Sequence, residues 1–111
     1  MKHPGGSSNG VRWMPLARWV GWPEYVLHTL AGLIMNESSG RERAINEAPP
    51  YCWGLTQLAR GWRIGAWPIR GSREPFNALD AETCLRKSLG IFRDQGDSFL
   101  PAWRGDPAVG W

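Results

Sequence analysis

One apolar helical stripe constrains the fold of this chain more than any other feature. Its members recur at the three- and four-residue spacing of a single helix face: Leu27, Leu30, Leu33 and Ile34. The preceding Gly-Trp-Pro-Glu at residues 21–24 is typical of a helix start, because Pro suits the first turn and Glu suits the positive end of the helix dipole. The pattern therefore predicts a helix from about Pro23 to Ser38.

Glu37 lies at the end of this predicted helix and continues the apolar stripe beyond Ile34. A carboxyl group held against apolar walls has a raised pKa, which is what a general acid working near neutral pH needs. The structural alternative is a carboxylate at a helix C-terminus that pairs with Arg41 or Arg43. Glu37 is the candidate catalytic residue.

A second helix is predicted from about Ala81 to Gln95, where Asp80 is a suitable N-cap and Gly96 a C-terminal stop. Its expected inner face comprises Leu85, Ser88, Leu89 and Phe92. Residues 11–21 are expected to form a short helix or an irregular packing arm.

The segments between and after the helices are expected to be irregular. Residues 41–51 predict a loop or irregular β structure, and residues 51–58 a strand that turns into a helix at Gly54. Residues 61–75 predict a long loop, and residues 99–111 an irregular strap. The expected fold is mainly α (α+β), with a short irregular β or loop region between the two principal helices.

The length of 111 residues favours one small domain with a single core. Residues 1–10 are rich in Gly and Ser and predict a flexible leader, so residues 11–111 form the domain. The leader lacks the apolar region of a secretory signal, and no stretch approaches membrane-spanning length. We expect a monomer that does not insert into membranes.

Eight tryptophans exceed what one small core readily hides, so we expect at least half in the core and a few, Trp62 among them, along a surface groove. Flat aromatic faces suit sugars, bases or lipid headgroups. The net charge of +3 comes mainly from scattered arginines, which favour an anionic polymer weakly. No basic run indicates a nucleic-acid partner.

No metal site or cofactor is predicted. His3 and His28 are isolated, and Cys52 and Cys84 lack a ligand motif. The two cysteines allow one disulfide or two buried thiols. An acid, aromatic faces and amides together suit a glycosidase, because sugars bind by stacking and hydrogen bonds and their cleavage needs a proton donor.

Three ordered motifs carry a resemblance to a known family: Glu-Ser-Ser-Gly at residues 37–40, Ala-Ile-Asn at 44–46 and Trp-Gly-Leu-Thr-Gln at 53–57. In this order the chain resembles the soluble lytic transglycosylase and goose-type lysozyme family, whose pattern is Glu-Ser-Gly-Gly, Ala-Val-Asn and Tyr-Gly-Leu-x-Gln. Asp-Ala-Glu at residues 80–82 looks like the family's Asp-Pro-Glu segment. The resemblance covers about Trp22 to Trp103 and is closest to compact actinobacterial and phage variants.

The resemblance implies a lysozyme-like fold and cleavage of the β-1,4 bond between N-acetylmuramic acid and N-acetylglucosamine in peptidoglycan glycan strands. Glu37 matches the catalytic acid, which then acts as a base. Ser38 matches the serine that helps orient substrate or intermediate. Gly54 matches the position where the backbone comes close to the sugar, and Gln57 the amide at the cleft wall.

Asn46, Trp53 and Trp62 complete the expected substrate-binding set. Trp53 stands where the family usually has Tyr, and Cys84 where it usually has Asn. The family's later Ala-Tyr-Asn segment, whose tyrosine normally supports the acid, is missing.

One clear acid without a clear second carboxylate favours a lytic transglycosylase over a hydrolytic lysozyme. Glu47 and Asp80 are the candidates for a second carboxylate by position. The alternative is a non-catalytic cell-wall-binding or virion structural domain with the same shape. Because no secretory signal is present, we expect a phage protein that is carried in the virion or released at lysis.

Overall fold

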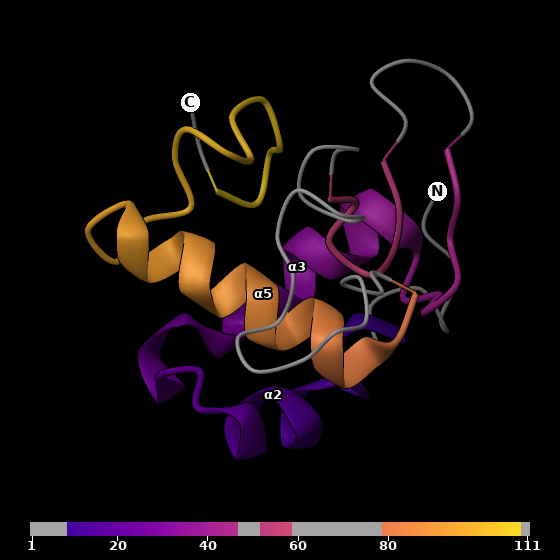
Figure 1. The fold of residues 1–111 in the computed structure, drawn as a ribbon, viewed down its shortest axis with the longest axis horizontal. Helices are drawn as coiled ribbons and strands as arrows, with labels where there is room; N and C mark the ends of the chain where they lie inside the picture. Colours follow the sequence, from indigo (N-terminus) through magenta and orange to yellow (C-terminus); the bar gives the residue numbers. More distant parts are fainter. Residues whose placement is uncertain (1–8, 47–51, 59–78, 110–111) are drawn as a thin grey trace, which may run out of the picture.

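Helices form most of the described part of the chain in this computed structural model, which describes residues 9–46, 52–58 and 79–109 (Figure 1). The elements are α2 (Met14–Val20), the 3-10 helix η1 (Glu24–Val26), α3 (Leu27–Ser38) and α5 (Ala81–Asp94). Within those three ranges the β structure is limited to two isolated bridges, which pair Trp53 with Ile45 and with Leu58. The fold is therefore mainly α, as the sequence predicts. The predicted loop at residues 61–75 and most of the predicted leader lie outside the described residues.

Helix α3 ends at Ser38, as the apolar stripe predicts, but its α-helical part begins later than expected. Pro23 is extended, and residues Glu24–Val26 form the tighter 3-10 turn before α3 begins at Leu27. Ser39 ends the helix because its φ of 56° is left-handed, and its N–H still reaches the carbonyl oxygen of Met35 at 3.0 Å. Glu37 thus lies in the last turn of a well-defined helix.

Helix α2 confirms the short helix expected within residues 11–21. Gly21 ends it with a φ of 118°, a conformation that residues with a side chain rarely adopt. Gly10, at the end of the predicted leader, lies so close to the main chain of Ala31 that any side chain there would collide with it. The ordered domain therefore includes at least Gly10.

Helix α5 also confirms its prediction, from the cap to the final turn. Oδ2 of Asp80 accepts the N–H of Thr83 at 3.0 Å, and Gly96 follows the helix with a φ of 75°. Of the predicted inner face, Leu85, Ser88 and Phe92 are buried, while Leu89 is half-buried against the core. Local sequence signals were sufficient for this element.

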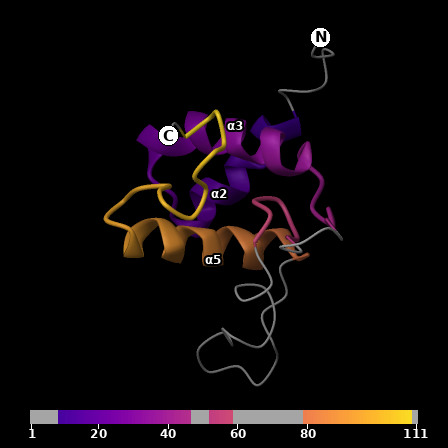
Figure 2. The same cartoon turned by 90° about the horizontal axis from the view of Figure 1, so that it is seen from above.

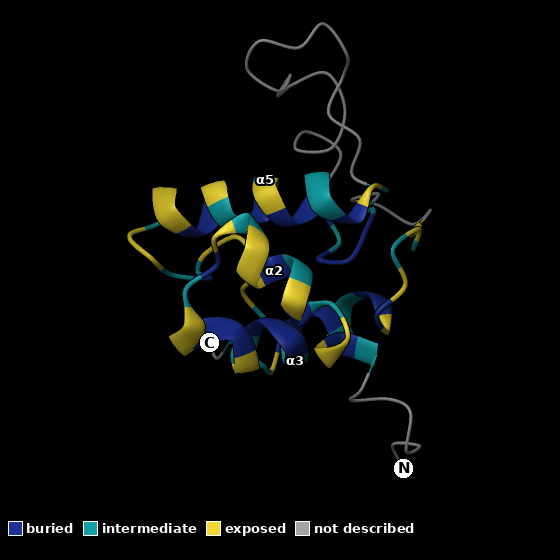
Figure 3. Ribbon diagram, turned by 90° about the horizontal axis from the view of Figure 1, so that it is seen from below, coloured by how far each residue is buried: buried dark blue, intermediate teal, exposed yellow. Residues whose placement is uncertain are grey.

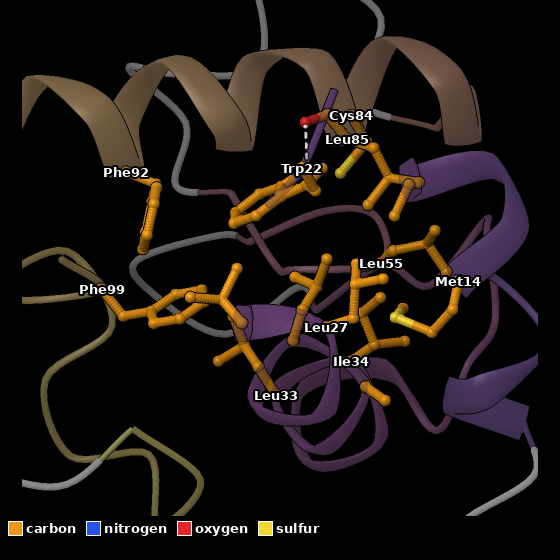
Figure 4. Close-up of a cluster of buried hydrophobic side chains, with 14 of the residues drawn as sticks. Met14, Trp22, Leu27, Leu33, Ile34, Leu55, Cys84, Leu85, Phe92 and Phe99 are labelled. Atoms are coloured by element: carbon orange, nitrogen blue, oxygen red, sulfur yellow. Dashed lines mark hydrogen bonds between the residues drawn. The ribbon is translucent and has the colours of Figure 1, made fainter. Parts of the chain in front are cut away.

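The core lies between α3 and α5, whose buried faces are turned toward one another, and α2 packs along one side of the pair (Figures 1, 2 and 3). Side chains from all three helices and from the turn at residues 53–58 meet there (Figure 4). The residues labelled in that view are Met14, Trp22, Leu27, Leu33, Ile34, Leu55, Cys84, Leu85, Phe92 and Phe99.

Trp22 is the aromatic centre of this core. Its ring stacks on Phe99 with centroids 5.8 Å apart and lies 5.2 Å from the ring of Phe92. The indole Nε1 donates to the carbonyl oxygen of Leu85 at 3.0 Å, which satisfies the one polar group of the buried ring (Figure 4). Trp103 is buried in the same way, with Nε1 donating to the carbonyl oxygen of Thr56 at 2.9 Å.

The prediction that a helix begins at Gly54 is wrong, because residues 53–58 form no helix. The segment is a tight turn closed by Trp53 and Leu58, which exchange N–H to oxygen bonds of 3.0 and 2.8 Å. Gly54 and Gln57 have φ angles of 90° and 55°, and such positive values are incompatible with a right-handed helix. The turn instead inserts Leu55 into the core.

Residues 99–109 form the expected irregular strap, and they run from the end of α5 back across α3 (Figures 1 and 2). Gly32 of α3 allows this close packing, because a Cβ atom there would lie 3.2 Å from Cβ of Ala108 and the strap would have to move back slightly. A mid-helix glycine ordinarily costs stability, so close packing by the strap is a physical reason for it. No helix in the described ranges has the length and apolar character needed to cross a membrane.

Candidate functional site

Glu37 is half-buried in the last turn of α3, next to the buried stripe that its spacing predicts. The ion pairs found among the described residues join Arg18 to Glu24 and Arg86 to Glu82. The alternative in which Glu37 pairs with a following arginine is therefore wrong for this structure.

The partner of Glu37 is another carboxyl group, that of Asp106 in the strap. Asp106 is only 5% exposed, and its Oδ1 accepts two hydrogen bonds of 2.9 Å, from Nδ2 of Asn36 and from the N–H of Ala108. Its Oδ2 is buried without a donor among the described residues. A carboxyl group that keeps its proton has one O–H, which can donate to such an oxygen.

The pKa of Glu37 rises from its usual 4.5 to about 8. Burial is the main cause, because an apolar environment disfavours the charged form. The hydrogen bond to Asp106 and the negative charge of Asp106 add to the effect. Glu37 is therefore mostly protonated at neutral pH, as a general acid must be.

Asp106 is the residue that sequence reasoning missed. The local signal is Gly-Asp-Pro at residues 105–107, which is typical of a turn in which the Asp side chain binds the backbone two residues on. That signal predicts the bond to Ala108 but not the contact with Asn36, which is 70 positions away along the chain. Of the two carboxylates considered instead, Asp80 caps α5 and Glu47 lies outside the described residues.

Ser38 is adjacent to Glu37 in sequence but faces the interior. Its side chain is buried, and its hydroxyl donates to the carbonyl oxygen of Ile34 at 3.0 Å. The hydroxyl therefore stabilises the last turn of α3. The carbonyl oxygen of Ser38 accepts from the backbone N–H of Arg41 at 3.1 Å and from its Nε at 3.3 Å.

A chain of hydrogen bonds connects the end of α3 to the turn at residues 53–58. The backbone carbonyl oxygen of Arg41 accepts from the N–H of Ala44 at 3.2 Å, and the carbonyl oxygen of Ala44 accepts from the N–H of Gly54 at 2.8 Å. Nε2 of Gln57 donates to the carbonyl oxygens of Ala44 and Gly54, at 3.3 and 3.1 Å. The three sequence motifs are thus joined in one hydrogen-bonded unit, although they are separate in the chain.

The remaining predicted binding residues belong to the same unit or lie outside the described part. Asn46 is exposed, and its N–H donates to the carbonyl oxygen of Cys52 at 2.9 Å. Trp53 is half-buried against the core and forms both isolated bridges. Gly54 is buried, so its backbone contributes to the turn. Trp62 lies outside the described residues.

A second tie holds this unit against α5. Oε2 of Glu42 accepts the N–H of Ala81 at 2.8 Å, so it satisfies a free donor in the first turn of that helix. Trp13 makes a further bond to the loop, with Nε1 donating to the carbonyl oxygen of Gly40 at 2.7 Å. The loop after Glu37 is therefore held at Gly40 and at Glu42.

A hollow of about 270 Å³ lies on this loop and is lined by Arg41, Arg43, Ala44 and Ile45. Its volume is just below the range of ligand-sized pockets, which is about 300–1,000 Å³. The side chain of Ile45 is exposed, so the hollow combines positive charge with an apolar surface beside it.

The described residues include no group of three or more His, Cys, Asp or Glu side chains that could hold a metal ion. Cys52 and Cys84 are both thiols, and burial raises the pKa of the Cys84 thiol. Oγ1 of Thr56 lies 2.8 Å from Oγ of Ser88 and 3.4 Å from Sγ of Cys84, so this polar cluster is satisfied internally.

Comparison of the chain with protein-family models, with curated proteins and with solved structures finds no match. The functional argument therefore rests on the site itself.

Proposed function

We propose that the protein is a peptidoglycan-cleaving enzyme with a lysozyme-like fold, in which Glu37 is the catalytic acid. The observation that carries the proposal is the raised pKa of Glu37, about 8, at a half-buried helix end beside Asp106. A group with that pKa keeps its proton at neutral pH and can give it to a leaving oxygen. The ordered motifs from Glu37 to Gln57, joined by hydrogen bonds, support the choice of substrate.

The substrate is the β-1,4 bond between N-acetylmuramic acid and N-acetylglucosamine. Glu37 donates its proton to the glycosidic oxygen, and the bond from that oxygen to C1 of N-acetylmuramic acid breaks. The substrate's own acetamido group stabilises the positive charge at C1. The peptide stems of peptidoglycan carry carboxylates, which the arginines around the hollow at Arg41 and Arg43 attract.

The carboxyl pair favours a transglycosylase over a two-carboxylate hydrolase. Enzymes that use two carboxylates place them about 5–9.5 Å apart, on either side of the bond they cleave. Asp106 instead lies close enough to Glu37 to raise its pKa, which does not suit two carboxylates that flank the bond. In the second step Glu37, now a carboxylate, takes the proton of the sugar's 6-hydroxyl group while that oxygen bonds to C1 and closes a 1,6-anhydro ring.

A gel containing peptidoglycan tests the activity. Wild type is expected to form a cleared band, whereas Glu37→Gln, which cannot donate the proton, is expected to lose clearing and still bind cell wall. Glu82→Gln is the matched control, because it makes the same change in the exposed ion pair with Arg86. Cell-wall binding by the wild type without clearing would identify a non-catalytic binding domain instead.

Mass spectrometry of the digested wall distinguishes the two reactions. A transglycosylase gives products that end in 1,6-anhydro-N-acetylmuramic acid, whereas a hydrolase gives reducing ends that contain one added water. Hydrated ends alone would exclude the transglycosylase assignment. Because Glu37 must be protonated, activity is expected to fall as pH rises through about 8.

A further inference from the structure

We propose that Asp106 is the positioning residue of the catalytic acid: its Oδ2 accepts the hydrogen bond of protonated Glu37 and fixes the direction of the proton that Glu37 donates. The inference rests on the proposed acid role of Glu37 and names the group that supports it. The family that the chain resembles normally uses a tyrosine for support. In this chain we assign that support to a carboxylate of the C-terminal strap.

The first argument is the hydrogen-bonding state of Asp106. Both its anchors bind one oxygen, Oδ1, through Asn36 and the backbone of Ala108. The other oxygen, Oδ2, is buried and has no donor among the residues that the structure describes. Leaving a buried carboxylate oxygen without a donor is costly, so the O–H of Glu37 is favoured strongly at this position.

The second argument is that the side chain of Asp106 is held rigidly. Asp106 is placed by a side chain of α3 itself, so the carboxylate and Glu37 are held by the same helix turn. The strap is fixed further by the close contact of Ala108 with Gly32 and by the buried ring of Trp103. A hydrogen-bond acceptor fixed in this way orients the acid before substrate arrives.

The third argument is charge. Among the described residues, Asp106 is the ionisable group whose charge raises the pKa of Glu37. The nearest cations along the two segments, Arg41 and Arg104, are both exposed, and Nε of Arg41 donates to the carbonyl oxygen of Ser38. Within the described part of the chain, no cation is among the causes that set the pKa of Glu37, so none offsets the repulsion from Asp106.

This repulsion has a consequence for the second half of the reaction. After Glu37 has given up its proton, its carboxylate is negatively charged in a half-buried site beside the negative charge of Asp106. Glu37 is then a stronger base than an isolated carboxylate, because regaining a proton restores the hydrogen bond to Asp106. The same residue therefore helps Glu37 to accept the proton of the incoming hydroxyl group.

Asp106→Asn tests the proposal, because it keeps the shape and the Oδ1 acceptor but removes the charge and places an N–H₂ group beside Glu37. That group donates to ionised Glu37 and so stabilises the form that cannot act as an acid. Two measurements are made on the full chain: the pH profile of cell-wall clearing, and the Glu37 pKa by carbon-13 NMR of the labelled side-chain carboxyl group. We expect the basic limb of the clearing profile and the NMR pKa of Glu37 to move down together by about 1–2 pH units.

Two further variants keep the test decisive. Asn36 is exposed on α3, so Asn36→Ala is expected to leave the fold intact while it removes one of the two hydrogen bonds that hold Oδ1 of Asp106. We expect the pH profile and the NMR pKa of Glu37 to move down by less than in Asp106→Asn. Asp97→Asn is the control, since Asp97 is exposed and its left-handed backbone (φ 58°) suits Asn equally well. It is expected to leave both readouts unchanged.

Folded Asp106→Asn and Asn36→Ala proteins with the pKa of wild-type Glu37 would overturn the proposal. If Asp106→Asn does not fold, the Asn36→Ala result decides. A lowered NMR pKa in a protein that never clears cell wall would support the pairing and refute the proposed enzymatic function, so the two failures are distinguishable.

Discussion

Replacing Glu37 with glutamine tests the carboxyl pair through folding energy, without any substrate. The pKa of Glu37 is raised from 4.5 to about 8 in the folded protein. Between these two pH values the folded state keeps a proton that the unfolded state has released. The free energy of unfolding of the wild type is therefore expected to fall as pH rises from 4.5 to about 8, and this contribution is constant outside that window.

The size of the effect follows from the same values. Each tenfold change in proton affinity is worth about 1.4 kcal/mol, so the rise to about 8 sets an upper limit of ~5 kcal/mol. Because Glu37 is only half-buried, water screens part of this energy, and we expect about 2 kcal/mol. Glutamine does not ionise and can still donate to Oδ2 of Asp106. Glu37→Gln is thus expected to equal the wild type at about pH 4.5 and to exceed its stability by about 2 kcal/mol above pH 8.

Urea unfolding followed by tryptophan fluorescence, at several pH values across this window, measures the difference directly. Glu82→Gln serves as the control, because it removes an exposed charge with the ion-pair partner Arg86 and is expected to keep the wild-type slope. Equal slopes for the wild type and Glu37→Gln between pH 4.5 and 8 would refute the reasoning, since the folded and unfolded states would then bind the same number of protons.

Three other predictions test the fold. Trp22→Ala is expected to cost about 3–5 kcal/mol in urea unfolding, because it empties the aromatic centre of the core, whereas Trp19→Ala at an exposed position costs less than about 0.5 kcal/mol. Asp80→Ala is expected to cost about 1 kcal/mol through loss of the α5 cap, and an unchanged midpoint would contradict that role. The Cys84 thiol is expected to resist alkylation in the native protein and to react only after unfolding, as mass spectrometry of the digested chain can show.

The helices could be predicted because their signals are local. The spacing of the α3 stripe, the Asp80 cap and the Gly96 stop depend on residues within about one turn of each other, so they are visible in the chain itself. The turn at residues 53–58 could not be predicted in the same way. It depends on positive φ at Gln57, a residue that rarely adopts it, and on the docking of Leu55 in a core formed by distant segments.

In the candidate site, too, local features could be predicted from the sequence and contacts between distant segments could not. The apolar spacing along residues 27–37 is enough to place Glu37 at the end of an apolar helix face and to predict a raised pKa for it. The influence of Asp106 on Glu37, and the bond from the hydroxyl of Ser38 to the carbonyl oxygen of Ile34, become visible only in the folded chain. The reason is that a contact between α3 and a strap 70 positions later depends on how Trp103 and Ala108 pack, and packing over that separation leaves no periodic signal in the sequence.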